Sequence, residues 1–125
     1  MIPEDKSLLL KDLCARLPYG VKINIRSDYT NTLEDMELNV YHLDSLYSIE
    51  YRHLRPYLRS MSSMTEEEAI VYITLTHYNT DDEGKPYREL TVAAIDWLNS
   101  HHFDYRRLIG KGLALEAPEG MYKTE

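Results

Sequence analysis

The chain has 125 residues, of which 43% are hydrophobic and 28% are charged. This length and composition predict one globular domain over residues 1–125 and exclude a disordered polymer and a membrane-spanning protein. The formal net charge of −7 favours solubility and argues against binding dominated by nucleic-acid phosphates, which needs clustered Lys and Arg. The single cysteine, Cys14, excludes an intramolecular disulfide and a cysteine-rich zinc site.

The sequence shows no targeting signal and no membrane span. The first residues include Glu4 and Asp5, whereas a signal peptide begins with basic residues. The longest apolar runs, residues 8–10 and the mixed run 69–75, are far shorter than a membrane span. We therefore expect a cytoplasmic protein with no membrane partner.

Periodicity predicts a helix over residues 4–17, followed by a strand. Apolar residues recur at three- and four-residue spacing in one stripe: Leu9, Leu10, Leu13, Cys14 and Leu17. Four polar residues fall largely outside this stripe: Lys6, Lys11, Asp12 and Arg16. Cys14 is interpreted as a small core residue. Pro18 and Gly20 end the helix. The alternating residues Val21, Ile23 and Ile25 then predict a half-buried strand.

Two more strands are predicted from alternating apolar and polar residues. The second contains Met36, Leu38 and Val40 and runs to about Leu43. Asp44-Ser45 is interpreted as a turn. The third strand contains Tyr47, Ile49 and Tyr51. The short connections favour an antiparallel meander.

The segment after Tyr51 is predicted to be irregular up to a helix start at Thr65. Pro56 is expected to break any regular element. Thr65 and Glu68 have the spacing of a capping box, with Thr65 as the N-cap. Residues 69–76 are rich in β-branched side chains, so their propensity favours a strand while the cap favours a helix. We predict a helix that runs to about Tyr78.

The last third of the chain is predicted to be helical. Residues 79–85 form a polar, acidic loop, and Pro86 begins a helix over residues 87–102. Its core stripe contains Leu90, Ala93, Ala94, Trp97 and Leu98. Asp104 caps a short helix over residues 105–111, ended by Gly112, and residues 113–125 form an extended piece and a tail. The predicted fold class is α+β: an antiparallel sheet of about three strands, an N-terminal helix and two to three C-terminal helices.

Three stretches, residues 11–22, 56–68 and 95–115, resemble a family of small uncharacterised proteins that are common in gut Bacteroidetes genomes and in their phages or prophages. Together they cover a little over a third of the chain. The resemblance implies a mobile-element or phage-related cytoplasmic protein. It carries over no activity and no catalytic residue.

No motif predicts a metal, a cofactor or a catalytic group. His101 and His102 are adjacent on a helix and point about 100° apart, so with Asp104 they do not define a metal site. The consecutive acids of residues 81–83 do not match an EF-hand loop. Residues 110–112 lack the pattern of a phosphate loop. Ser62-Ser63 has no nucleophile motif around it.

The strongest candidate site is a contact surface that carries tyrosine and arginine. Its residues are Tyr47, Tyr51, Arg52, Arg55, Tyr57 and Arg59. Tyr and Arg carry much of the binding energy at protein interfaces, and they also stack on nucleic-acid bases. We therefore expect a non-enzymatic interaction protein that binds a protein partner or a second copy. The alternatives are a nucleic-acid accessory protein that uses these arginines with Arg106 and Arg107, and an enzyme built on the His101–Asp104 segment.

Overall fold

The structure is a computed structural model that describes residues 3–27, 32–45 and 51–122. It confirms the α+β class. The helices and strands are, in chain order, α1 (Pro3–Arg16), β1 (Lys22–Ser27), β2 (Leu33–Glu37), α2 (Val40–Ser45), β3 (Tyr51–Leu58), α3 (Glu66–Leu75), β4 (His77–Thr80), β5 (Pro86–Glu89), α4 (Val92–Ser100) and β6 (Leu115–Glu116). Two short 3₁₀ turns, Leu17–Tyr19 and Met61–Ser63, follow α1 and β3. None of the helices in the described ranges is long and apolar enough to cross a membrane.

The main sheet has the order β2-β1-β3-β6. β1 pairs antiparallel with both β2 and β3, and β6 adds a short parallel pairing to β3. The predicted antiparallel meander is therefore wrong in its order, because β3 lies beside β1 and not beside β2. Helix α2 intervenes between β2 and β3 and carries the chain to the far side of β1. In the predicted third strand, Tyr47 and Ile49 lie outside the described residues.

The predicted second strand ends earlier than expected, and a helix takes over its second half. β2 stops at Glu37, and α2 begins at Val40. The side-chain oxygen of Asn39 accepts a hydrogen bond from the backbone amide of Tyr41 at 2.9 Å, as an N-cap does. The alternation at residues 36–40 thus extends across Asn39, whose capping role a period-two pattern does not reveal.

Pro56 does not break the chain but lies inside β3, opposite Ile23 of β1. The carbonyl of the next residue, Tyr57, faces β1, where it accepts a hydrogen bond from the Tyr122 hydroxyl. Since polar groups alternate between the two edges of a strand, the nitrogen of Pro56 faces away from β1. On that edge β6 pairs only with Tyr57 and Leu58, so no ladder bond is lost.

The buried face of α1 is rotated from the predicted stripe. Its buried residues are Leu9, Asp12, Leu13 and Arg16, while Cys14 is exposed. The prediction that Cys14 is a core residue and that Asp12 and Arg16 lie outside the buried face is wrong. The two polar residues are buried because they pair: Arg16 Nε donates to Asp12 at 2.8 Å, four residues earlier on the same face.

The main core lies between α1 and the sheet and includes the turns after α4. Its members are Leu9, Leu13, Val21, Ile23, Ile25, Leu38, Leu54, Leu58, Leu108, Leu113 and Ala114. A second group of buried side chains consists of Ala94 and Leu98 of α4 and Phe103, which follows this helix. In the predicted stripe of α4, Leu90 and Ala93 are exposed, so only Ala94, Leu98 and the half-buried Trp97 face the interior.

The capping box of α3 is confirmed, with Thr65 and Glu68 each accepting from the other's backbone amide. In the predicted loop at residues 79–85, the first two residues belong to β4, and residues 81–85 form the turn of the β4–β5 hairpin. Asp81 accepts hydrogen bonds from the backbone amides of Glu83 and Lys85. Consequently Pro86 begins a strand, and α4 starts later than predicted, where the Thr91 hydroxyl accepts from the Ala94 amide.

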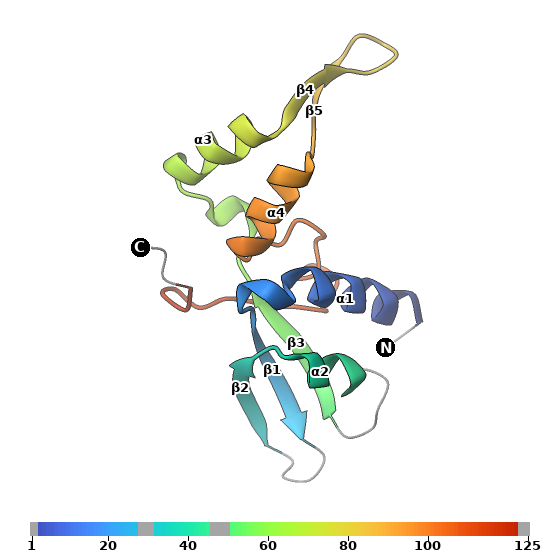
Figure 1. Cartoon of the computed structure of the whole chain (residues 1–125), viewed down its shortest axis with the longest axis vertical. Helices are drawn as coiled ribbons and strands as arrows, with labels where there is room; N and C mark the ends of the chain where they lie inside the picture. The colour runs from blue at the N-terminus through green and yellow to red at the C-terminus, as the bar shows by residue number, and fades with distance from the viewer. Residues whose placement is uncertain (1–2, 28–31, 46–50, 123–125) are drawn as a thin grey trace.

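After α4 the chain returns to the end of β3. The Arg59 amide donates to the carbonyl of His102, and the Asp104 amide donates to the carbonyl of Arg59. Asp104 then accepts from the amides of Leu108 and Ile109, which closes turns in place of the predicted helix over residues 105–111. Figure 1 shows the strands β1–β3 at one end of the long axis and the β4–β5 hairpin at the other, with α3 and α4 between them.

Candidate interaction surface

The predicted contact residues lie on or before β3, and the structure places half of them. Tyr47 lies outside the described residues, as do the side chains of Tyr51 and Arg52. Leu54, Pro56 and Leu58 are buried, so the half-buried residues Arg55, Tyr57 and Arg59 alternate onto the opposite face of the strand. Two of these three side chains make contacts within the chain.

Tyr57 is held by the edge strand of the sheet. Its hydroxyl donates to Asp35 of β2 at 2.8 Å, and Asn24 of β1 donates to the same carboxylate oxygen at 2.9 Å. Hydrogen bonds from Asn24 and Tyr57 lower the pKa of Asp35, while burial and the nearby Asp35 raise the pKa of Tyr57. Tyr57 thus contributes to a polar bridge across three strands of the sheet.

Arg59 connects the end of β3 to the start of α3. Its guanidinium makes two hydrogen bonds to the carboxylate of Glu68, at 2.8 and 2.7 Å, and lies 4.2 Å from the centre of the Phe103 ring. The hydrogen bonds from Arg59 lower the pKa of Glu68 to about 2. A bidentate pair of this kind fixes the relative orientation of the two side chains in addition to pairing their charges. Arg59 therefore has a structural role at the base of α3.

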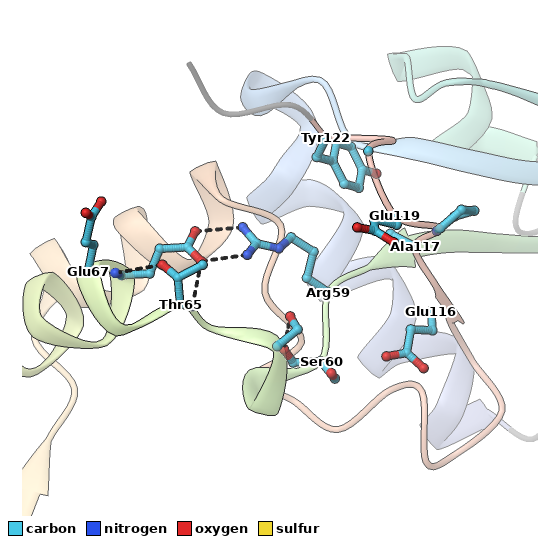
Figure 2. A pocket seen from close by; sticks show the side chains of 12 residues that line it. Arg59, Ser60, Thr65, Glu67, Glu116, Ala117, Glu119 and Tyr122 are labelled. Carbon is cyan, nitrogen blue, oxygen red and sulfur yellow. Dashed lines mark hydrogen bonds and ion pairs between the residues drawn. The ribbon is translucent and has the colours of Figure 1, made fainter.

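A pocket of about 590 Å³ opens beside this ion pair. Figure 2 shows Arg59 between the start of α3 on one side and the segment of Ala117 and Glu119, with Tyr122, on the other. Three exposed carboxylates also line the pocket: Glu67, Glu116 and Glu119. Arg59 is the cation among the lining residues, and Glu68 already neutralises it. The pocket is therefore acidic and does not bring the predicted contact residues together.

The structure does not gather the histidines and Asp104 into a metal site. His101 stacks on Trp97, whereas His102 stacks on Tyr122 with ring centres 3.7 Å apart. Burial, and then the charge of Arg16, lower the pKa of His102 to about 4. Within residues 3–27, 32–45 and 51–122, no group of three or more His, Cys, Asp or Glu side chains is placed to hold a metal ion.

Arg106, one of the two further arginines of the nucleic-acid alternative, belongs to a buried polar cluster. The carboxylate of Asp12 accepts from Arg16 at 2.8 Å and from Arg106 at 3.2 Å. Arg16 also donates to the carbonyl of Phe103, and Tyr105 lies beside both guanidinium groups. This cluster attaches the turns after α4 to α1. Two of the five arginines of that alternative, Arg59 and Arg106, are therefore paired with carboxylates.

A different surface stands out by its exposed apolar side chains. We call residues 66–92 the arm; it comprises α3, the β4–β5 hairpin and the chain leading into α4. Among the described residues, seven of the eleven exposed large apolar side chains lie in it: Ile70, Val71, Ile73, Tyr78, Tyr87, Leu90 and Val92. Ile70 is 66% exposed and Tyr78 is 59% exposed. Ile70, Val71 and Ile73 share the outer side of α3, and a contiguous exposed apolar patch of this kind marks interaction surfaces.

The arm also lacks an interior of its own. Helix α3 has ten residues and no buried side chain, and seven of the eight residues in the two hairpin strands are exposed. Short helices derive most of their stability from packing, and an isolated two-stranded hairpin is marginal in water. The body of the protein holds the arm at its base, through the Arg59–Glu68 pair and through Tyr72, whose ring stacks on that of Trp97.

This surface is not among the sites predicted from the sequence, although the sequence carries a signal for it. Residues 69–75 are apolar on every side of the helix except at Thr74, and a helix of that kind is normally buried. An apolar helix at the edge of so small a domain therefore indicates a partner. The sequence alone did not show that the body leaves this helix uncovered.

Comparisons with protein-family models, with curated proteins and with solved structures find no match to this chain. The resemblance to the Bacteroidetes and phage family therefore stays a prediction.

Proposed function

We propose that this protein is a non-enzymatic interaction protein that self-associates, and that the arm is its contact surface. The observation that carries the proposal is α3, a ten-residue helix without one buried side chain. Its outward residues Ile70, Val71 and Ile73 are all exposed. Covering them would remove apolar surface from water at about 25 cal/mol for each Å².

The size and character of the arm support a second copy as the occupant. Tyr78 and Tyr87 lie on opposite faces of the hairpin, because Tyr78 is opposite Arg88 and Tyr87 is opposite Asn79, so at most six of the seven side chains share one face. At on the order of 100 Å² each, they bury less than the roughly 800 Å² per partner of an interface of standard size, as a weak and reversible dimer does. In a two-fold dimer the same patch serves both copies. The apolar arm of one copy would then cover the apolar arm of the other.

Sedimentation equilibrium over a range of concentrations tests the proposal. We expect a reversible dimer. Ile70→Asp should raise its dissociation constant by about thirtyfold, the effect of losing roughly 2 kcal/mol at an interface centre. The matched control is Val40→Asp, which places the same charge at a 58% exposed apolar position on α2, outside the arm. A chain that stays monomeric, or equal effects of the two variants, would contradict the proposal.

The predicted surface at residues 47–59 is tested in the same experiment. Arg55→Glu should weaken the dimer if that surface is the interface, and should leave it unchanged if the arm is. A change of surface charge there is expected to alter the monomer's free energy of unfolding by no more than about 0.5 kcal/mol. The nucleic-acid alternative remains a prediction, and binding of a labelled single strand by the unmodified protein would support it.

A further inference from the structure

Helix α3 has opposite charges at its two ends, beside its exposed apolar face. Glu66 and Glu67 are exposed in its first turn. At its other end Arg88 of β5 lies against the last turn, donating to the carbonyl of Ile73 at 3.4 Å and contacting the Thr76 hydroxyl at 3.3 Å. The exposed face between these ends is formed by Ile70, Val71, Ile73 and Thr74.

The midpoint of α3 lies between Ile70 and Val71. If a two-fold axis passes there, the helices of two copies run antiparallel, and Ile70 of each copy lies near the axis. Glu67 of one copy then meets the last turn of the other helix, where Arg88 is held. A parallel arrangement would instead place Glu67 opposite Glu67 and Arg88 opposite Arg88, which repel.

From this charge complementarity we infer that two copies pair antiparallel through α3, with Glu67 of each copy opposite Arg88 of the other. The inference rests on the proposed self-association and adds the orientation of the copies and the residues that select it. The apolar face supplies affinity, and the charges at its ends select the antiparallel register. Because these charges are exposed, salt should screen their contribution.

Exchange of the two charges tests the orientation in the full chain. Glu67→Arg and Arg88→Glu should each weaken the dimer by about tenfold at low salt, since each creates two like-charged contacts by symmetry. The double variant Glu67→Arg/Arg88→Glu should restore the dissociation constant to within about threefold of the unmodified value. The controls Glu4→Arg and Lys111→Glu change exposed charges outside the arm and should have no effect.

Disulfide cross-linking gives a second test that does not depend on the charges. In a Cys14→Ser background, Glu67→Cys and Thr74→Cys lie equally far from the midpoint of α3, on opposite sides of it. Antiparallel pairing predicts a cross-linked dimer when the two single variants are mixed and oxidised, and little from either alone. Parallel pairing predicts the reverse, with each single variant cross-linking to itself.

The outcomes separate this inference from the proposed function. A dimer that Ile70→Asp weakens, but that shows no rescue in the charge exchange and cross-links as parallel helices do, overturns the antiparallel pairing and leaves self-association intact. A chain that is monomeric at every concentration overturns both. If Arg88→Glu unfolds the arm, seen as lost helix signal in circular dichroism, the cross-linking pattern still decides the orientation.

Discussion

The hydroxyl of Tyr122 accepts a hydrogen bond from the backbone amide of Lys22 at 2.7 Å, across one hundred positions of sequence. The same hydroxyl donates to the carbonyl of Tyr57 at 2.8 Å. Continuing the β1–β3 register from Ile23 and Pro56 places Lys22 opposite Tyr57, so the hydroxyl stands where a direct bond between the strands would run. Burial raises the pKa of Tyr122 from 10.0 to about 12, so the donating hydroxyl stays protonated well into the alkaline range.

Tyr122→Phe should destabilise the fold by about 1–3 kcal/mol, because it leaves the Lys22 amide and the Tyr57 carbonyl without their shared partner. The ring would still stack on His102. Urea unfolding measures the loss, and faster hydrogen exchange at the Lys22 amide would localise it. Tyr19→Phe, at an exposed tyrosine, is the control and should change the free energy of unfolding by less than about 0.5 kcal/mol.

Glu68 should make the free energy of unfolding depend on pH under acidic conditions. Its pKa is about 2 in the folded chain against a model-peptide value of 4.5, so the unfolded chain binds its proton first. The stabilisation from the Arg59 pair is therefore complete above about pH 4.5 and is lost as the pH falls towards 2. Glu68→Gln keeps the capping oxygen but removes the charge, and should cost roughly 1.5–3 kcal/mol at pH 7. Urea titrations at several pH values should show a flatter acid limb for the variant.

His102 should contribute a separate pH dependence nearer to neutrality. Its pKa of about 4 lies below the model-peptide value of 6.5, so the unfolded chain takes up the proton first as the pH falls. The free energy of unfolding should then decrease between about pH 6.5 and 4, by up to about 1.4 kcal/mol for each pH unit. His102→Phe retains an aromatic ring beside Tyr122 and should remove this slope. An unchanged slope in the variant would assign the effect to another group.

Asp12→Asn should be among the most damaging single changes. The carboxylate and Arg16 are both fully buried, and Arg106 shares the same carboxylate. Removing one charge of a buried pair leaves the other uncompensated, at a cost of about 3–5 kcal/mol. Thermal unfolding should show a large fall in melting temperature. Asp96→Asn, at an exposed position of α4, is the control, and equal losses would contradict the buried pairing.

Trp97→Ala should loosen the junction between the arm and the body. The indole stacks on Tyr72 of α3, on His101 and on Phe103, with ring centres 6.2, 4.4 and 5.6 Å away. We expect a loss of about 3 kcal/mol, at the lower end of the range for large aromatic truncations because the ring is only half-buried. Urea unfolding measures it, and Trp97→Phe should recover more than half. A melting temperature unchanged by the alanine substitution would mean that the ring does not carry this contact.

Local signals in the sequence predicted the elements that depend on local chemistry. The capping box of Thr65 and Glu68 was sufficient to choose a helix over a strand for a β-branched run, and alternation at Val21, Ile23 and Ile25 identified β1. The pairing order could not be predicted, because it depends on α2, which in turn depends on one cap at Asn39.

The sites were harder to predict because they depend on contacts between distant residues. The local pattern predicts Asp12 and Arg16 as surface residues. Their burial depends on Arg106 and on the carbonyl of Phe103, which lie about ninety positions away in the sequence. Similarly, the exposure of Ile70 follows from the position of α3 at the edge of the body, and no local pattern encodes it. The predicted contact segment at residues 47–59 has been placed only in part, so its role remains a prediction.

The backbone of Arg59 pairs with that of Phe103, and this pairing separates the arm from the rest of the fold. The chain leaves the sheet after Arg59 and returns to pair with it at Phe103. The arm lies between these two residues in the sequence, so this pairing can persist when the arm unfolds. None of the side chains in the arm, residues 66–92, is buried, so it should unfold at a lower free energy than β1 and β3. Amides of β4 and β5 should exchange with deuterium long before those of the sheet. A protease that cuts the turn at Asp81–Gly84 should leave both fragments attached to an otherwise folded body.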